Sequence, residues 1–289
     1  MRILVLGGAS HGGGASLVCD VIYLTKNQSL AGILDSATTE YKGIKDYWDD
    51  RAKRKDPSAT TDDLCLRELE FRTLVKTLKQ LRLPDGANIL DVGCGDGFTT
   101  ARLAKKFPQY NFTGFDFSPK MIENARKHDN VTFIVANVLD MYDFGRFDVT
   151  ITDRCLINIL ELCEQVRAIY QIAHHTKTYY IAIENFLQGH NNMNTARAKV
   201  GLNIVEIRWH NNYFDSNVFS QIVRKHFDII HVNKFSSTYY FVTRVLYAKV
   251  CDVLKVTPTH NTLLHKLSIK LLSVGNLSPI AMYVMKKKE

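Results

Sequence analysis

The sequence predicts an α/β fold, a doubly wound and mostly parallel sheet with helices on both of its faces. From Asn88 onward, apolar segments of strand length alternate with amphipathic segments of helix length, which is the pattern of parallel sheets. A glycine-rich turn also joins the first of these strands to the helix after it, as in nucleotide-binding units. The chain has 289 residues and is 46% apolar, so it can bury the core that such a fold needs.

Seven segments are expected to form strands, five in the alternating region and two in the less regular C-terminal third. They are Asn88–Val92, Asn111–Asp116, Val131–Ala136, Phe147–Thr152, Thr178–Glu184, Phe227–Asn233 and Pro279–Met285. Helices are expected to begin near Phe98, Pro119 and Asn158, and an amphipathic helix is expected over Leu263–Leu272. The helix near Asn158 should place Leu162, Val166, Ile169 and Ala173 along its buried face.

The N-terminal region divides into two parts. Residues 1–36 predict a small βαβ segment, with strands at Arg2–Leu6 and Leu30–Leu34 and a helix over Ala15–Leu24. That segment is too small to bury a core of its own. Residues 37–289 are assigned to the main domain, which opens with a polar, helix-prone stretch ended by Pro84-Asp85-Gly86.

Bulk properties narrow the functional classes. A net charge of +8 suits an anionic partner, such as nucleic acid, a nucleotide-linked substrate or an acidic membrane face, but also an ordinary basic surface. The six cysteines form no Cys-x-x-Cys pair, so neither a metal site nor a disulfide framework is expected. No apolar run approaches the roughly 20 residues of a membrane helix, and no signal peptide is recognisable. We expect a cytoplasmic protein without a membrane span.

One combination of motifs predicts a ligand-binding site. A strand ends at Asp91, runs into Gly93-x-Gly95-x-Gly97 and opens a helix, and the next strand ends in Asp116. Glycines allow the backbone to turn sharply and approach a ligand, and an acid about 20 residues further on can bind ribose hydroxyls. A tight turn without a ligand is the alternative.

The ligand expected there carries positive charge. Asp91 and Asp96 flank a helix N-terminus and would repel a pyrophosphate, which that terminus otherwise attracts. They suit a ligand that combines an ammonium group, a sulfonium and a ribose diol. S-adenosylmethionine has all three.

These motifs resemble those of the class I S-adenosylmethionine-dependent methyltransferases. Ile89–Gly97 resembles the family's first motif and Phe115–Met121 its second, in which the acid binds the ribose. Asn137 falls where the family contacts the adenine, although many members have aspartate there. The resemblance implies a seven-stranded sheet with Pro279–Met285 antiparallel near the edge. The implied cofactor residues are Asp91, Gly93, Gly95, Asp96, Asp116, Phe117, Met121, Asn137, Val138 and Asp153.

The acceptor pocket is expected beyond the carboxyl ends of the strands. His210 is the first candidate for a general base, since its unperturbed pKa is near neutral, and Asp153 and Glu184 are the others. Arg154 and Arg197 could grip a phosphate or carboxylate of the substrate, or form ion pairs. Tyr47, counted with the substrate-binding residues, and Trp48 are expected to cap the cofactor or to pack in the core. His210 could instead only bond a backbone carbonyl.

A second, looser resemblance concerns the acceptor. Segments near Arg154–Ile159, Ile183–Gly189, Gly201–Asn211 and Tyr239–Leu246 are similar to a bacterial branch that modifies sugars of surface polysaccharides. It implies O-methylation of a nucleotide-linked or glycan-linked sugar. The segment Ile3–Gly14 resembles the start of nucleotide-sugar acyltransferases, which makes it a vestige, a docking unit or an extension of the fold.

Other functions stay open. The basic charge favours a nucleic-acid methyltransferase, but the chain has neither an Asn/Asp-Pro-Pro-aromatic motif nor a Pro-Cys pair. A small-molecule N-methyltransferase would need less of a base, and a pseudo-enzyme would bind the cofactor only as a structural element. Homo-oligomerisation is also left open.

Overall fold

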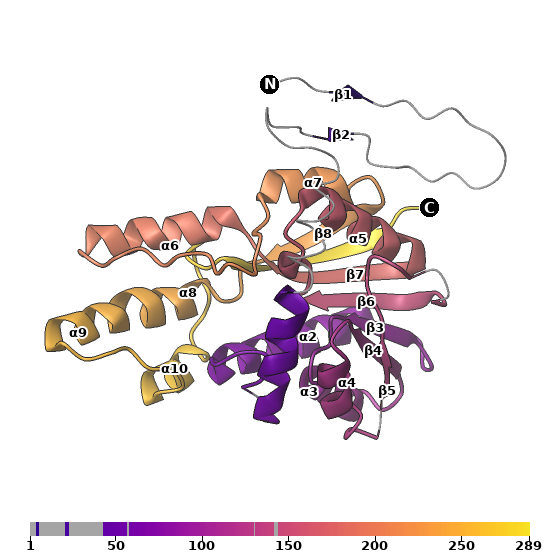
Figure 1. Ribbon diagram of the computed structural model, residues 1–289, viewed down its shortest axis with the longest axis horizontal. Helices are drawn as coiled ribbons and strands as arrows, with labels where there is room; N and C mark the ends of the chain where they lie inside the picture. The colour runs from indigo at the N-terminus through magenta and orange to yellow at the C-terminus, as the bar shows by residue number, and fades with distance from the viewer. Residues whose placement is uncertain (1–3, 6–20, 23–42, 57, 130, 142–143) are drawn as a thin grey trace.

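A seven-stranded sheet forms the centre of the molecule (Figure 1). The computed structural model describes residues 4–5, 21–22, 43–56, 58–129, 131–141 and 144–289. The strand order is β5-β4-β3-β6-β7-β9-β8, and all neighbours are parallel except β9, which is antiparallel to β7 and β8. The strands are β3 (Asn88–Val92), β4 (Asn111–Asp116), β5 (Thr132–Val135), β6 (Phe147–Asp153), β7 (Thr176–Asn185), β8 (Phe227–Asn233) and β9 (Ile280–Lys287). The predicted fold class and its antiparallel strand are confirmed.

The strand order fixes where a ligand can bind. The chain leaves β3 toward β4 and β5, and then returns to place β6 on the other side of β3. Helices after β3 and after β6 therefore lie on opposite faces of the sheet, which opens a crevice at the carboxyl ends of these two strands. The crevice lies where Asp91, near the end of β3, and Asp153, at the end of β6, were predicted to act.

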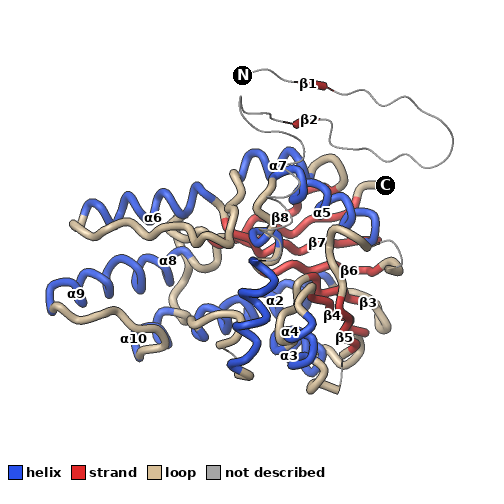
Figure 2. The backbone as a smooth tube through the Cα atoms, in the orientation of Figure 1, coloured by secondary structure: helices blue, strands red, loops and turns tan. Residues whose placement is uncertain are grey.

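Helices cover both faces of the sheet (Figure 2). α5 (Leu162–His175) and α7 (Ser216–Val223) pack on one face, in a cluster that includes Leu90 and Phe219. α2 (Leu64–Leu81) and α3 (Phe98–Lys106) pack on the other, in a cluster that includes Ile89 and Leu78. Neighbouring residues of β3 thus point to opposite faces, as the period of two in a strand requires.

Two predicted helix starts are confirmed and one is wrong. α3 begins at Phe98, and α4 (Pro119–Ala125) begins at Pro119 behind Ser118, whose side chain accepts a hydrogen bond from Met121 N. α5 begins at Leu162 rather than near Asn158, because Leu156–Asn158 forms a short 3-10 turn, η2. Ile169 and Ala173 are buried as predicted, whereas Leu162, the first residue of α5, is 46% exposed.

A group of helices extends to one side of the sheet (Figures 1 and 2). We call it the helical arm, and it had largely been left unassigned by the sequence pattern. It consists of α6 (Leu187–Lys199), α8 (Ser237–Tyr240), the π-helical turn η3 (Phe241–Leu246), α9 (Tyr247–Leu254) and α10 (Leu263–Ser268). The helix predicted over Leu263–Leu272 is present but ends at Ser268.

The N-terminal region is described in part. β1 (Leu4–Val5) lies within a predicted strand and pairs antiparallel with β2 (Val21–Ile22). A helix had been predicted over Ala15–Leu24, so that prediction is wrong at Val21 and Ile22. Residues 6–14 of the segment Ile3–Gly14 and the strand predicted at Leu30–Leu34 lie outside the described residues, and the division at residue 36 stays a prediction. Residues 43–51 are helical and lead into η1 (Ala52–Arg54).

A helix that crosses a membrane must be both long and apolar, and the described helices differ from this. None of them is both long and apolar enough to cross a membrane.

Candidate cofactor and acceptor cleft

A cavity of about 450 Å³ opens at the carboxyl ends of β3, β4 and β6. Its walls come from the glycine turn after β3, the loops after β4, β5 and β6, the segment 205–213 and part of the helical arm. Residues 43–56 and 58–63, here called the N-terminal cover, supply a further wall. The predicted cofactor residues that line it are Asp91, Gly93, Gly95, Asp116, Phe117, Met121, Asn137, Val138 and Asp153.

The glycine turn is shaped so that side chains are excluded at two positions. Gly93 has φ +74°, and a Cβ on it would lie 2.4 Å from Cys155 Sγ. Gly95 has φ +56°, and a Cβ there would lie 2.7 Å from Thr60 Cγ2. The amides of Gly93 and Cys94 both donate to Phe115 O, which ties the turn to β4. The backbone therefore borders the cavity directly, as close approach to a ligand requires.

Asp116 stands at the end of β4 beside this turn. Its Oδ2 accepts a hydrogen bond from Gly95 N at 3.0 Å, and its Oδ1 accepts one from Ser118 N at 2.9 Å. These bonds fix the carboxylate, and each oxygen keeps acceptor capacity toward the cavity. Burial raises the pKa of Asp116 to about 6.

Three carboxylates, Asp91, Asp116 and Asp153, line the same cavity. Asp91 Oδ2 accepts a hydrogen bond from Thr100 Oγ1 at 2.5 Å, and burial raises the pKa of Asp91 to about 7. Burial also raises the pKa of Asp153, against the opposing effect of Arg154. A ligand that brings positive charge would lower the cost of ionising these buried groups.

Asp96 is not brought to the cavity. Its carboxylate pairs with Arg67, with 2.6 Å between Oδ1 and Nη2, and Oδ1 also accepts from Phe98 N. Both side chains of the pair are buried. Asp96 thus caps α3 and joins it to α2, and the prediction that it contacts the cofactor has no support in this geometry.

The far end of the cavity offers a site for an aromatic ring. Phe117, Met121, Asn137 and Val138 line it. Met121 packs against Trp48, Ala52 and Ala59, which all belong to the N-terminal cover. Asn137 Oδ1 accepts a hydrogen bond from Leu139 N at 3.0 Å, so the amide predicted to bond adenine is already oriented by its own loop.

His210 lies in an aromatic cage at the acceptor end. Tyr47 stacks on its ring with 4.3 Å between the centroids, and Trp48 and Trp209 meet it edge-on. Burial, and then the charges of Arg208 and Arg51, lower the pKa of His210 to about 4. Its Nδ1 is buried with no hydrogen-bond partner among the described residues. The imidazole is therefore neutral at pH 7, and Tyr47 does not line the cavity itself but packs against His210 and Trp48, which do.

Arg154 follows β6 in the left-handed region, with φ +54°. Its Nε lies 2.9 Å from Glu70 Oε1, and its Nη2 donates to Glu70 Oε2 at 3.0 Å. Glu70 comes from α2 and is fully buried, and Asp153 Oδ1 lies 3.7 Å from the same Nε. The guanidinium lines the cavity but is held in an ion pair, which is the alternative considered for it.

Two predicted site residues lie elsewhere. Glu184 is fully buried below the cavity, where it accepts hydrogen bonds from Leu156 N at 3.1 Å and Ile157 N at 3.4 Å. It holds the η2 turn, and burial raises its pKa to about 8. Arg197 donates to the carbonyls of Asn203 and Arg244 in the helical arm and does not line the cavity.

The N-terminal cover is the part of the site that the sequence indicated only through one pair of aromatic residues. Arg51 holds it together by donating from Nε to Ala59 O at 2.8 Å and from Nη2 to Ser58 O at 2.5 Å. Ser118 Oγ donates to Asp49 Oδ1 at 2.5 Å, which fastens the cover to the end of β4. Only the adjacent Tyr47 and Trp48 pointed to this wall.

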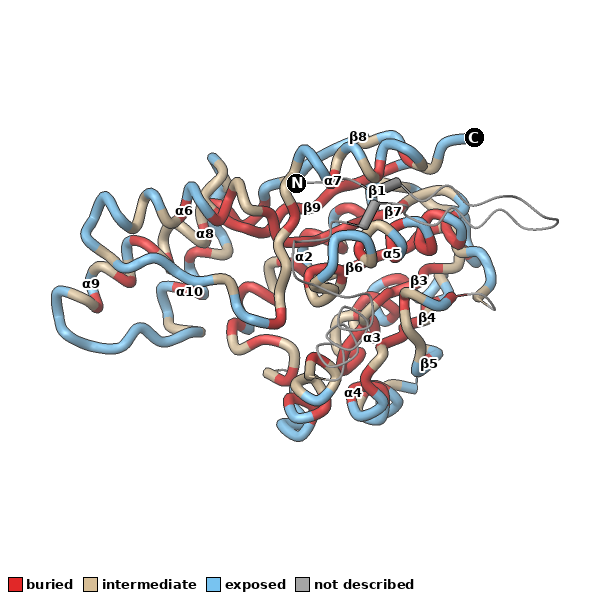
Figure 3. The backbone as a smooth tube through the Cα atoms, turned by 45° about the horizontal axis from the view of Figure 1, so that its top comes forward, coloured by how far each residue is buried: buried red, intermediate tan, exposed pale blue. Residues whose placement is uncertain are grey.

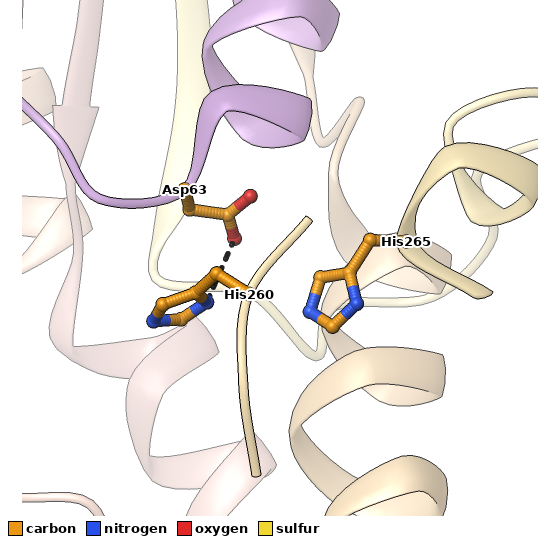
Figure 4. Close-up of side chains that lie close together, drawn as sticks. All are labelled: Asp63, His260 and His265. Carbon is orange, nitrogen blue, oxygen red and sulfur yellow. Dashed lines mark ion pairs between the residues drawn. The ribbon is translucent and has the colours of Figure 1, made fainter. Parts of the chain in front are cut away.

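Asp63, His260 and His265 lie close together at one edge of the cleft (Figure 4). One ligand atom from each lies within 4.8 Å of the others. However, Arg244 Nη2 lies 2.5 Å from Asp63 Oδ2, and Tyr239 donates to Asp63 Oδ1 at 2.6 Å. A metal ion would have to compete with a guanidinium for the only carboxylate. We interpret the cluster as an ion-pair junction between the start of α2 and the helical arm.

Sequence comparisons identify a methyltransferase segment. A family model described as a methyltransferase domain matches residues 83–200. Trans-aconitate 2-methyltransferase of Enterobacter sp. (strain 638) is 44% identical over 55 residues, which are 19% of this chain and 22% of that protein. Malonyl-(acyl-carrier protein) O-methyltransferase of Hahella chejuensis (strain KCTC 2396) is 41% identical over 85 residues, 29% of each chain. The chain thus matches less than a third of the length of these relatives.

Solved structures share the fold over most of the chain. Magnesium protoporphyrin IX methyltransferase from Synechocystis PCC 6803, crystallised with S-adenosylhomocysteine, superposes with a TM-score of 0.56 at 15% identity. The alignment covers 86% of this chain and 100% of that one. The N-methyltransferase NodS from Bradyrhizobium japonicum WM9, also crystallised with that product, gives 0.52 at 12% identity over 85% and 99% of the chains. The fold is therefore that of S-adenosylmethionine-dependent methyltransferases.

Proposed function

We propose that this protein is a methyltransferase that uses S-adenosylmethionine as its methyl donor. The observation that carries the proposal is the cavity itself, where a glycine turn without room for side chains borders three carboxylates, two of which, Asp91 and Asp116, are buried. Its chemistry fits a ligand with a ribose diol and two positive groups. The family match over residues 83–200 supports the same activity.

Each wall of the cavity has a role in this proposal. Asp116 would accept hydrogen bonds from both ribose hydroxyls, while Phe117, Met121 and Val138 hold the adenine. Asp91 and Asp153 would face the cationic groups. When bound, S-adenosylmethionine supplies an electrophilic methyl group, and the protein contributes the alignment of the acceptor with it.

We propose a sugar hydroxyl, nucleotide-linked or glycan-linked, as the acceptor. Neutral hydrogen-bonding side chains line that end of the cavity, among them Asn158, Asn185 and Tyr213. The side-chain oxygens of Asn158 and Asn185 are buried without partners in the described part of the chain, so they are available for hydroxyl groups. A hydroxyl acceptor also needs a base, and a neutral His210 can take its proton.

A carboxylic acid acceptor is the second candidate. Arg208 lines the cavity and forms no ion pair with the other described residues, unlike Arg154 and Arg244. A free guanidinium favours an anionic group on the substrate. The relatives named after trans-aconitate and malonyl-acyl-carrier protein give this candidate further weight.

Methyl transfer from radiolabelled S-adenosylmethionine tests the proposal. The protein is incubated with a panel of nucleotide sugars, a panel of di- and tricarboxylic acids, and RNA. We expect label in a nucleotide sugar, lost when Asp116 is replaced by alanine. Label in the acids alone would select the second candidate, label in RNA alone would contradict both, and no binding of the donor would contradict methyltransferase activity itself.

A further inference from the structure

The helical arm carries apolar side chains on its outward surface. Between Leu246 and Val274 eleven large apolar residues are exposed, and they are Leu246, Val250, Val253, Leu254, Val256, Leu263, Leu264, Leu267, Leu271, Leu272 and Val274. Leu272 is 83% exposed and Leu263 72%. Figure 3 shows a long exposed stretch from the end of α9 through the connection to α10. A clustered apolar surface of this kind marks an interaction site.

Two helices of the arm, α9 and α10, expose large apolar side chains and bury small or polar ones, which is the opposite of an ordinary surface helix. In α9 the small residues Ala248 and Cys251 are buried, while Val250, Val253 and Leu254 are exposed. In α10 the buried residues are His265 and Ser268, while leucines face outward. The apolar side of a surface helix normally faces the protein core. The outward apolar sides of α9 and α10 therefore favour contact with an apolar partner outside the protein.

A shallow apolar hollow continues the same surface. It has a volume of about 380 Å³ between the end of α6 and α9. Val200, Leu246, Val250 and Val253 contribute to its lining, and Lys249 is its single charged residue.

The excess of positive charge on the arm favours binding to an anionic partner. Between Leu246 and Val274 the chain has four lysines and one acidic residue, Asp252. Asp252 pairs with Lys249 and Lys255. Lys266 and Lys270, which accompany the leucines of α10, make no ion pair with any described residue. Their ammonium groups remain uncompensated on an apolar surface.

We propose that the helical arm binds the surface of an anionic lipid bilayer. Leucine and valine side chains would enter the region between headgroups and acyl chains, while Lys266 and Lys270 meet lipid phosphates. A second copy of the chain fits less well, because a two-fold contact places each lysine-bearing patch against itself. Arg244 of η3 and His260, in the connection between α9 and α10, also line the cleft. The arm would thus hold the cleft near membrane-anchored acceptors, a consequence that rests on the proposed function.

Vesicle co-sedimentation of the full chain tests this inference without any assay of activity. The probes are vesicles of phosphatidylcholine alone and of phosphatidylcholine with phosphatidylglycerol. We expect binding to the anionic vesicles, at least about tenfold weaker to the neutral ones, and a decline with rising salt.

Two double variants locate the surface. Leu263→Ser with Leu267→Ser should lower partitioning about tenfold or more, because both exposed side chains lose their apolar insertion. Lys266→Glu with Lys270→Glu should abolish the preference for anionic lipid. The matched control is Val218→Ser with Ile230→Ser, two exposed apolar residues of α7 and β8 outside the arm, which should bind as the unmodified chain does.

Three outcomes would overturn the inference. One is equal sedimentation with and without anionic vesicles. Another is an equal loss in the control variant. The third is a stable dimer, measured by light scattering, that only the leucine variant dissociates, since that would assign the surface to a second copy. Calorimetry with S-adenosylhomocysteine on each variant keeps this result separate from the cofactor proposal, because the arm substitutions should leave that affinity unchanged.

Discussion

At the scale of single residues, the protonation state of His210 determines whether the proposed acceptor end of the cavity contains a general base. Its pKa of about 4 keeps the imidazole neutral with an unpartnered Nδ1 that can accept a proton, and it also makes His210 a weaker base than a free imidazole. The aromatic cage holds the ring in one orientation, which a general base requires.

We therefore expect His210→Ala to lower turnover by about 10²–10⁴-fold, the usual contribution of a general base. The affinity for S-adenosylmethionine should stay within about twofold, since other residues bind the cofactor. Single-turnover kinetics and calorimetry measure the two effects. Retained turnover would assign proton removal to Asp153 or would indicate a carboxylate acceptor, which needs no base.

The residues predicted to line one site come together where the backbone itself encodes the site. Gly93, Gly95 and Asp116 lie at the cavity, because the turn requires glycine and the acid follows a recognisable strand. Asp96 and Glu184 do not line the cavity, because Arg67 pairs with one and two loop amides bind the other, contacts that a sequence cannot show. Whether a carboxylate is available to bind a ligand or instead stabilises the fold depends on the residues that contact it in the folded structure.

At the scale of elements, α6 lies in close contact with the backbone segment that precedes β9. A Cβ on Gly189 would lie 1.7 Å from Ser278 O, a backbone atom that cannot rotate away. Gly189 therefore lets α6 approach the segment that precedes β9, and this approach sets where the helical arm leaves the sheet.

Gly189→Ala should lower the free energy of unfolding by about 1–3 kcal/mol or more, as overpacking against backbone does. The matched control is Gly145→Ala, where a Cβ would meet nothing within 4 Å, and it should be neutral or slightly stabilising. Urea unfolding monitored by circular dichroism compares the two. Equal stability of the two variants would contradict the packing described for α6.

A second element-scale prediction concerns the junction of Asp63 with the arm. Because Arg244 already neutralises Asp63, we expect EDTA to leave the melting temperature unchanged, and added zinc to raise it by no more than experimental error. Arg244→Met should lower stability, since it strands a buried carboxylate. A large rise with zinc in the unmodified protein would instead identify Asp63, His260 and His265 as a metal site.

Strands were predicted better than helices in this chain. All seven segments expected in the main sheet are strands, because short apolar runs in a parallel sheet have few alternatives. In the arm, α10 was predicted from its amphipathic pattern, whereas α6, α8 and α9 were not assigned. The N-terminal cover was predicted to be helix-prone, but its attachment depends on the contacts of Arg51 and Asp49, which a sequence does not show.

At the scale of the whole molecule, buried carboxyl groups tie stability to pH. Burial raises the pKa of Asp116 to about 6, of Asp91 to about 7 and of Glu184 to about 8. The folded state thus binds protons that the unfolded state has lost, so its stability falls as pH rises through these values. Buried histidines such as His210 have lowered pKa values, and their opposite effect is complete by about pH 6.5.

The ligand-free protein should consequently melt at a lower temperature at pH 9 than at pH 6.5. S-adenosylmethionine should raise the melting temperature more at pH 9, because its sulfonium, which is charged at every pH, compensates the ionised Asp91. Differential scanning fluorimetry at the two pH values measures both effects. A higher melting temperature at pH 9 without ligand would show that these carboxyl groups are not desolvated as described.

The most direct test of the cofactor cleft is calorimetric titration of S-adenosylhomocysteine into the unmodified protein and into Asp116→Ala. The substitution removes a carboxylate acceptor, a loss of about 1.5–3 kcal/mol, and leaves Gly95 N and Ser118 N without their partner. We predict saturable binding by the unmodified protein and at least about tenfold weaker binding by the variant. Equal affinity in the two proteins, or no binding at millimolar ligand in either, would contradict the account.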